Sequence, residues 1–277
     1  MVSGTVSFAC SACGKCCNSP PMMTVPELFH HEDLFVGTLG VRPGAAGAFD
    51  LVTQGLDYPA NGVCPARGPQ GLCGIHNQHK PAMCRTVPLD PFQPDAMQHR
   101  VLLHRNTGAG YIGAECIVPG EREGMDVLVA DGVVADPGYR QQLHTHRQLL
   151  AEERELWGAA VTQMLRGQMP PAPRGGGGGM LTLPLVPILS VLAAWSEACR
   201  LRCLRYMQQQ CALLDRQIGL ALQRKREQDR TVTAEFRTYA AAYRRLADAL
   251  ARGGVPPAGS ASEAARAEAY LGVSTRA

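Results

Sequence analysis

The residues of this chain that are best suited to chemistry are cysteines near its N-terminus. Eleven cysteines occur among the 277 residues, and eight precede residue 117: Cys10, Cys13, Cys16, Cys17, Cys64, Cys73, Cys84 and Cys116. Thiolates are preferred ligands of zinc and of iron in iron–sulfur clusters, whereas magnesium and calcium prefer oxygen. Eight thiols suffice for two four-thiolate sites, or for one iron–sulfur cluster and one zinc ion.

The first four of these cysteines lie within one short loop. The Cys10-x-x-Cys13 spacing lets two sulfurs meet one tetrahedral metal, because the residues between them form a tight turn whose backbone N–H groups point at the sulfurs. Gly14 suits such a turn because glycine tolerates a positive φ. The adjacent Cys16 and Cys17 point in different directions, so either they serve two metals or one of them is not a ligand.

The redox compartment decides whether these cysteines are ligands or disulfides. The first eight residues lack the basic start and the apolar stretch of a signal peptide. The most apolar run, residues 181–195, is shorter than the roughly 20 residues that a bilayer needs, and it contains Pro184 and Pro187. We therefore expect a cytoplasmic chain without a membrane span, in which thiols persist. A disulfide scaffold is the less favoured alternative.

The order of the cysteine motifs resembles a known family. The motifs are Cys10-x2-Cys13-Gly14-x-Cys16-Cys17, Gly62-x-Cys64, Cys73-Gly-Ile75-His76 and Pro81-x2-Cys84-Arg85. Their succession is similar to that of the YkgJ-type cysteine cluster proteins, small bacterial proteins described as zinc- or iron-chelating. The resemblance covers about residues 8–116 and implies that the eight cysteines are metal ligands. The chain departs from the family pattern at Lys80, where arginine usually precedes the proline.

Two residues beside the cysteines are further candidates. His76 follows Cys73 by three residues, so it could be an additional ligand, or it could donate a hydrogen bond to a sulfur or a carbonyl. Arg85 directly follows Cys84, and its guanidinium would offset the negative charge of a thiolate site without binding the metal. An ordinary surface arginine is the alternative.

The functional hypotheses differ in what the metal does. The first is a non-catalytic protein in which zinc or iron has a structural or metal-handling role. The second is an iron–sulfur redox or sensor protein with the same ligands. The third follows from the resemblance, since a related cluster occurs in flagellin lysine methylases: a cluster-dependent, protein-modifying enzyme. No nucleophile with its base and no phosphate-binding glycine loop is recognisable, so we expect no catalytic or cofactor-binding residues outside the cluster.

The elements that must position the cysteines predict an α+β fold. We expect residues 1–120 to form a loop-rich, metal-stabilised domain with a few short helices and strands. Residues 121–170 add a hairpin and an amphipathic helix, and residues 171–180 form a Pro/Gly linker. Residues 181–252 form a helical region, either one very long helix or a helical pair. Residues 253–277 are expected to be a disordered tail.

Local signals give the details of this prediction. Thr24 and Glu27 have capping-box spacing for a helix that Gly40 would end. Residues 41–98 are expected to be irregular, and Arg100 to His104 to form a strand. Asp131-Gly132 is a hairpin signal. Asp136-Pro137 is a helix start.

The C-terminal part carries the remaining cysteines and the excess of positive charge. Residues 175–277 contain 14 Lys and Arg against 8 Asp and Glu. A solvated helix face is the default interpretation of this charge, and the binding of an acidic protein partner is the alternative. Nucleic acid is a less favoured partner, because acidic residues are interleaved and aromatic residues are sparse. Cys199, Cys203 and Cys211 are expected to pack in the core as small apolar residues.

Overall fold

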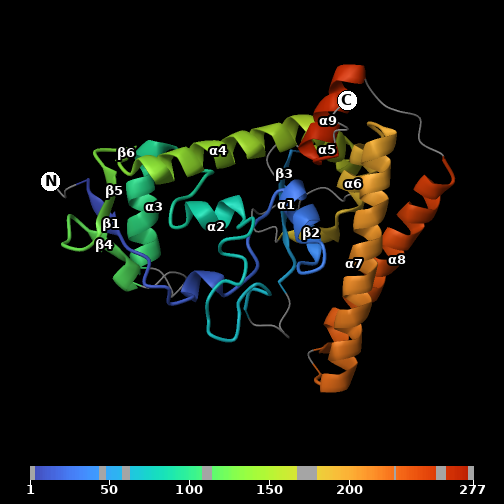
Figure 1. The fold of residues 1–277 in the computed structure, drawn as a ribbon, viewed down its shortest axis with the longest axis horizontal. Coiled ribbons are helices and arrows are strands. Elements are labelled where there is room, and N and C mark those ends of the chain that lie inside the picture. Colours follow the sequence, from blue (N-terminus) through green and yellow to red (C-terminus); the bar gives the residue numbers. More distant parts are fainter. Residues whose placement is uncertain are drawn as a thin grey trace. The chain divides into compact units, whose positions relative to one another are not determined.

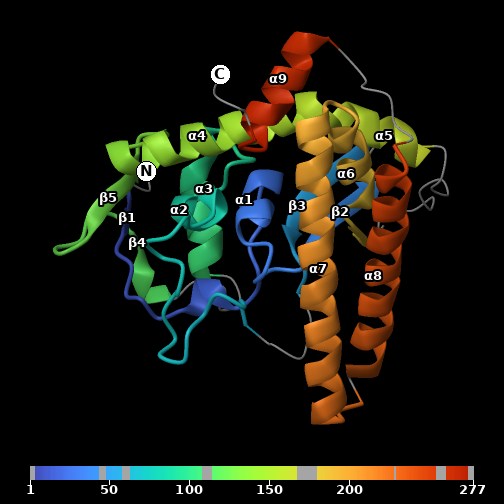
Figure 2. The same ribbon diagram turned by 45° about the vertical axis from the view of Figure 1, so that its right-hand side comes forward.

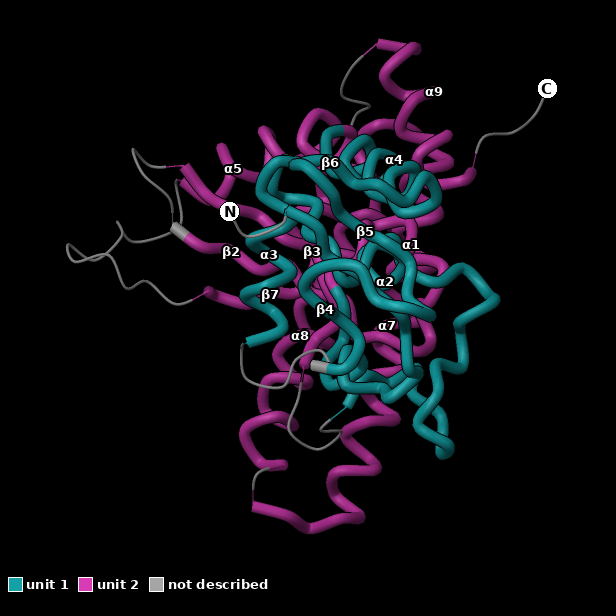
Figure 3. Tube along the Cα trace, turned by 90° about the vertical axis from the view of Figure 1, so that its left-hand side faces the viewer, with its two compact units in different colours: residues 1–21, 62–151 teal, residues 22–61, 152–277 magenta. Residues whose placement is uncertain are grey.

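The structure is a computed structural model that describes residues 4–43, 48–57, 63–107, 114–166, 180–227, 229–253 and 260–273. Helices and strands are mixed and the C-terminal half is helical, as expected for an α+β protein. The chain divides into two compact units (Figure 3). Unit 1 consists of residues 1–21 and 62–151, and unit 2 of residues 22–61 and 152–277. These limits differ from the expected domains, since each unit is built from separate parts of the chain.

Unit 1 is built on a four-stranded antiparallel sheet (Figure 1). In the order of the sheet its strands are β4 (Ile117–Pro119), β1 (Val6–Phe8), β5 (Asp126–Ala130) and β6 (Val133–Val134). Its helices are α2 (Ala82–Thr86), α3 (Asp95–Thr107) and the first part of α4 (Pro137–Glu153). The apolar core includes Val6, Leu102 and Ile117, none of which is exposed to solvent.

The predicted hairpin and the start of the following helix are confirmed. Asp131 and Gly132 adopt positive φ values of 48° and 78° between β5 and β6, as the commonest two-residue hairpin turn requires. The Asp136 side chain accepts a hydrogen bond of 2.7 Å from the Tyr139 backbone N–H. This contact caps the first turn of α4, in which Pro137 is the first residue.

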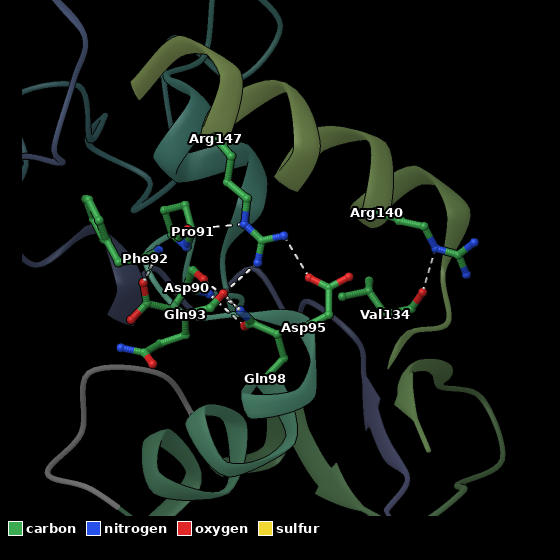
Figure 4. A network of polar contacts seen from close by, with 9 residues as sticks. All are labelled: Asp90, Pro91, Phe92, Gln93, Asp95, Gln98, Val134, Arg140 and Arg147. Atoms are coloured by element: carbon green, nitrogen blue, oxygen red, sulfur yellow. Dashed lines mark hydrogen bonds and ion pairs between the residues drawn. The ribbon is translucent and has the colours of Figure 1, made fainter. Parts of the chain in front are cut away.

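Polar contacts join α4 to the segment before α3 (Figure 4). The Arg147 guanidinium donates to the carbonyls of Pro91 and Gln93 and pairs with Asp95 at 2.7 Å. The buried Gln98 amide donates to the carbonyls of Asp90 and Gln93. These contacts fix a turn-rich segment that has little regular structure of its own.

Unit 2 combines a three-stranded antiparallel sheet with the longest helices of the chain. The sheet has the order β3 (Phe49–Gly55), β2 (Gly37–Pro43), β7 (Leu181–Pro184). The helices are α1 (Val25–His30), α5 (Ala159–Arg166), α6 (Val186–Ala193), α7 (Glu197–Arg224), α8 (Asp229–Ala251) and α9 (Ala261–Tyr270). A π-helical turn, Arg154–Gly158, links α4 to α5. The expected helical pair is α7 and α8, which lie side by side (Figures 1 and 2).

Several expected elements are wrong in type or extent. The Thr24–Glu27 capping box is present, but the helix ends after His30 and Gly37 begins a strand. Residues 41–98 are less irregular than expected, because they contain the end of β2, all of β3 and α2, and the start of α3. The expected strand Arg100–His104 lies inside helix α3. The short apolar run at Val101 fits a strand or one face of a helix equally well.

The C-terminal tail is a further correction. Residues 261–270 form α9, which begins with a capping box between Ser260 and Glu263. Ala267 and Tyr270 are buried, so this segment is packed on the unit rather than disordered. Of the expected linker 171–180, all but Met180 lies outside the described residues. Among the helices that the structure describes, none has the length and apolar character to cross a bilayer.

Candidate metal centre

All eight N-terminal cysteines belong to unit 1, and backbone contacts tie three of them together. Cys16 and Cys17 lie in a 3₁₀ helix, Lys15–Cys17. The Cys64 backbone N–H donates to the Cys17 carbonyl at 3.0 Å. A β-bridge between Arg67 and Cys73 then brings the third cysteine back to the turn after Cys64. Segments far apart in sequence therefore meet at Cys17.

Gly14 is required where the loop turns toward Cys17. Its φ is 70°, a left-handed conformation that favours glycine. A Cβ at this position would also meet the Gly71 carbonyl oxygen at 2.9 Å and the Arg67 side chain at 3.0 Å. The expectation that glycine permits this turn is confirmed, and close packing adds a second reason for it.

The thiols around Cys17 are close enough to influence one another. The Cys16 thiol donates a hydrogen bond to the Cys17 sulfur, which raises the pKa of Cys16 well above its usual range and lowers the pKa of Cys17. Burial opposes the lowering at Cys17. Negative charge on Cys64, Cys73 and Cys84 opposes it as well. Five thiols therefore share one electrostatic environment, and we call Cys16, Cys17, Cys64, Cys73 and Cys84 the Cys17 group.

A second, smaller group forms where β1 and β4 pair. The Cys13 side chain is hydrogen bonded to the side chains of Ser11 and Cys116. The oxygen of Ser11 and the sulfur of Cys116 are 3.1 Å apart. The backbone N–H of Ala9 donates to the Cys116 carbonyl at 3.0 Å and continues the strand pairing. The sheet thus brings Cys116 to the first cysteine loop across more than 100 residues of sequence.

Backbone N–H groups point at one sulfur in each group. Lys15 donates to the Cys13 sulfur, which is the main reason that the pKa of this thiol is lowered. Ala66 donates in the same way to Cys64, where burial nevertheless raises the pKa. In both cases the donor follows its cysteine by two residues. Such hydrogen bonds favour the thiolate, which is the form that binds metals.

The thiols are suitable donors for a metal, but they are not arranged as a complete set of ligands. None of the eleven cysteines, all of which lie in described segments, forms a disulfide. Cys10 and Cys13 are exposed, whereas Cys64 and Cys116 are buried. Within the described parts of the chain, no three His, Cys, Asp or Glu side chains are arranged to hold a metal ion. The sulfurs are near one another without forming a closed tetrahedral set.

The three C-terminal cysteines belong to unit 2 and have different surroundings. Cys199 and Cys203 are completely buried on α7, among the apolar residues of the core. Cys211 is half-buried, and its thiol donates to the Ala240 carbonyl at 3.7 Å. These positions fit the expected role in helix packing.

The two candidates beside the cysteines line a surface hollow. His76 and Arg85 are both exposed, and they border a hollow of about 400 Å³ together with Asn77, His79, Lys80 and Gln142. The positive charge that acts on the Cys16 thiol is that of Lys80, whereas the charge of Arg85 acts on His146. The ligand role expected for His76 and the charge-offsetting role expected for Arg85 therefore remain predictions.

Sequence reasoning missed one positioning residue, His146. This histidine is buried on α4, and its Nδ1 lies 3.3 Å from the Thr86 hydroxyl at the end of α2. The pKa of His146 is lowered to about 4, mainly by burial and also by the nearby Arg85 charge. Its spacing from Leu143 on one face of the helix was the available signal.

The basic C-terminal region uses many of its arginines internally. Arg202 pairs with Glu32 at 2.7 Å and lies over the Phe29 ring. Arg224 pairs with Asp229 at 3.1 Å, and Arg244 with Asp215 at 2.8 Å.

A comparison with known proteins adds no relative: no family model, curated protein or solved structure matches the chain.

Proposed function

We propose that this chain is a metal-binding cysteine-cluster protein of the YkgJ type, in which zinc or iron is held by the N-terminal thiols. The observation that carries the proposal is the convergence of the Cys17 group. Cys17, Cys64, Cys73 and Cys84 come from three separate stretches of the chain, and their charges act on one another.

The chemistry of the donors supports a soft metal. Thiolate sulfur favours zinc and iron–sulfur clusters, and the N–H groups of Lys15 and Ala66 favour the thiolate form of Cys13 and Cys64. Two groups of thiols also agree with two metal centres, one around Cys17 and one around Cys13 and Cys116. Binding would draw the sulfurs of each group closer together, since metal sites of this kind form together with their fold.

The proposed role of the metal is structural. The loop between Cys64 and Pro81 has little regular structure, and most of its side chains are half-buried or exposed. A bound metal would supply the stabilisation that such a loop cannot draw from an apolar core. We further propose a cytoplasmic, reducing location, because a thiol cluster persists there. We also propose that the basic helices bind an acidic protein partner. Only the arginines that form no contacts within unit 2 would take part in this binding.

The proposal is tested by metal analysis of anaerobically purified protein. We expect at least one equivalent of zinc or iron per chain, with a lower metal content in Cys17→Ser and an unchanged content in Cys211→Ser. Cys211 is a matched control, because it is also half-buried and serine can donate to the same carbonyl. Visible absorption and acid-labile sulfide would identify an iron–sulfur cluster and favour a redox or sensor role. Absence of stoichiometric metal, or equal content in both variants, would contradict the proposal.

A further inference from the structure

The residues that line the hollow beside the Cys17 group carry positive charge. Its six lining residues are His76, Asn77, His79, Lys80, Arg85 and Gln142. Two are permanent cations, two are imidazoles and two are amides, so the described lining contains no carboxylate. Every one of these side chains can donate a hydrogen bond. The hollow thus offers donors and positive charge to whatever enters it.

The two cations of the hollow are not used by the rest of the described chain. Neither Lys80 nor Arg85 forms a salt bridge or a side-chain hydrogen bond with any residue that the structure describes. Arg140 and Arg147 of the same unit behave differently, since both donate to backbone carbonyls (Figure 4). Arg147 also pairs with Asp95. Unit 1 therefore satisfies Arg140 and Arg147 internally, whereas the charge of Arg85 faces the hollow.

Packing between α2 and α4 fixes the position of Arg85. Thr86 contacts the buried His146 at 3.3 Å, and Arg85 directly precedes Thr86 on α2. Gln142 lies one turn before His146 on α4, on the same face of that helix. The same contact therefore brings Arg85 and Gln142 to one hollow. Because its pKa is lowered to about 4, His146 is neutral near neutral pH and does not compete with Arg85 for an anion.

We propose that this hollow binds a small molecule through a phosphate group. A guanidinium presents two parallel N–H donors that match phosphate oxygens, and an ammonium adds a second charge. A dianion gains from both cations, whereas a monocarboxylate gains half as much from each. The volume of about 400 Å³ falls in the range of roughly 300–1,000 Å³ that is typical of small-molecule sites. The proposal does not depend on the metal.

Titration of the whole chain, as purified, with inorganic phosphate, followed by phosphorus NMR and calorimetry, tests this assignment. We expect saturable binding to the native chain, with sodium acetate binding more weakly. Arg85→Ala should weaken phosphate binding by about tenfold or more, because a charge-assisted, two-pronged contact is lost. Arg85→Lys should restore part of the affinity, since it keeps the charge without the fork. Lys80→Gln provides an independent second variant.

Controls separate this site from general electrostatics and from the metal. Arg122 is an exposed cation of the same unit outside the hollow, so Arg122→Ala should leave phosphate binding unchanged. The metal content of Arg85→Lys, which keeps the positive charge, should equal that of the native chain. The proposal is overturned if phosphate does not bind saturably, if acetate binds equally well, or if Arg122→Ala weakens binding as much as Arg85→Ala. Loss of metal in Arg85→Ala with intact phosphate binding would show that Arg85 supports the cysteine cluster and does not bind phosphate.

Discussion

The two units use cysteine in opposite ways. In unit 1, Cys16 and Cys17 are half-buried in a short 3₁₀ helix, Cys73 is half-buried in a loop, and all three are near other thiols. In unit 2, Cys199 and Cys203 are fully buried on a regular helix. The same residue type is thus a candidate ligand in one setting and a packing residue in the other. The difference teaches that neighbouring thiols and loop placement, rather than the number of cysteines, mark a candidate metal site.

The units also differ in how they are stabilised. In unit 2 the buried side chain of Gln210 on α7 is satisfied internally: it accepts from the Gly37 N–H and donates to the carbonyls of Glu32 and Phe35. Its helices bury large side chains such as Tyr206 and Phe236. Unit 1 has a small apolar core around its sheet and a long loop that carries cysteines. We therefore expect unit 1 to depend on a metal and unit 2 to be independent of it.

The largest expected effect is that of metal removal. Structural zinc contributes on the order of 10 kcal/mol or more in small domains, so chelation should abolish the stable fold of the Cys64–Pro81 loop and weaken β1 and α3. Hydrogen exchange followed by mass spectrometry should show faster exchange in unit 1 after chelation. Helices α7 and α8 should keep their protection. Equal loss of protection in both units would show that they do not differ in their dependence on a metal.

The next largest effect is a pH dependence that belongs to unit 2. Glu153 is buried, and this burial raises its pKa to about 7. The Val25 N–H and the Tyr270 hydroxyl donate to it at 2.8 and 2.7 Å and oppose this increase, whereas negative charge on Glu27 and Glu152 contributes to it. The folded state then holds a proton that the unfolded state has already released. Stability is therefore highest below about pH 4.5 for this group and falls as the pH rises toward 7.

The size of this effect is about 3 kcal/mol, since one pKa unit corresponds to about 1.4 kcal/mol. Glu153→Gln keeps an oxygen that accepts both hydrogen bonds but cannot ionise. The difference in unfolding free energy between variant and native chain should grow from pH 5 to pH 8, measured by urea denaturation. Glu155→Gln is the control, because Glu155 is exposed and ion-paired. A constant difference between Glu153→Gln and the native chain would show that Glu153 does not titrate in this range.

A smaller effect is expected at Gly14 in unit 1. Gly14→Ala combines a strained positive φ with contacts of 2.9 and 3.0 Å, so we expect a loss of about 2–3 kcal/mol and reduced metal content. Gly124→Ala separates the two causes, because Gly124 also has a positive φ but nothing within 4 Å of its Cβ position. That control should cost only about 1 kcal/mol. If Gly14→Ala and Gly124→Ala lose the same stability in thermal denaturation, close packing does not contribute to the effect at Gly14.

The smallest effect is expected at the ion pairs of α9. Arg266 pairs with Glu155 at 2.7 Å and lies 3.8 Å from Glu152, and its side chain is 45% exposed. Exposed pairs contribute about 0–1 kcal/mol, so Arg266→Ala should change the unfolding free energy of unit 2 by about 0.5 kcal/mol or less. The burial of Ala267 and Tyr270 is expected to hold α9. A loss of several kcal/mol in chemical denaturation would show that the ion pairs hold it instead.

Local signals predicted the elements that local chemistry determines. The Asp131-Gly132 turn and the Asp136-Pro137 helix start were confirmed, because turn and cap residues act on their immediate neighbours. The same type of signal exists at Ser260 and Glu263, where a capping box opens α9. Its Ala- and Ser-rich surroundings led to the expectation of a disordered tail, although composition does not decide whether an amphipathic segment finds a surface to pack on.

Long-range pairings were not predictable from local patterns. Strand β7 pairs with β2 across about 140 residues, with Leu39 opposite Leu183. This pairing assigns residues 22–61 to unit 2 and makes unit 1 discontinuous. The convergence on Cys17 depends likewise on the backbone contact with Cys64 and the bridge at Cys73. The sequence indicated which cysteines could be ligands, whereas their division into a Cys17 group and a Cys13–Cys116 group required the fold.

The central claim, that N-terminal thiols bind zinc or iron, is tested most directly by X-ray absorption at the metal edge of anaerobically purified protein. The account predicts a first shell dominated by sulfur, at about 2.3 Å if the metal is zinc. The amount of sulfur-ligated metal per chain should fall in Cys17→Ser and stay unchanged in Cys211→Ser. A shell of oxygen or nitrogen atoms alone, or the absence of stoichiometric metal, would contradict it.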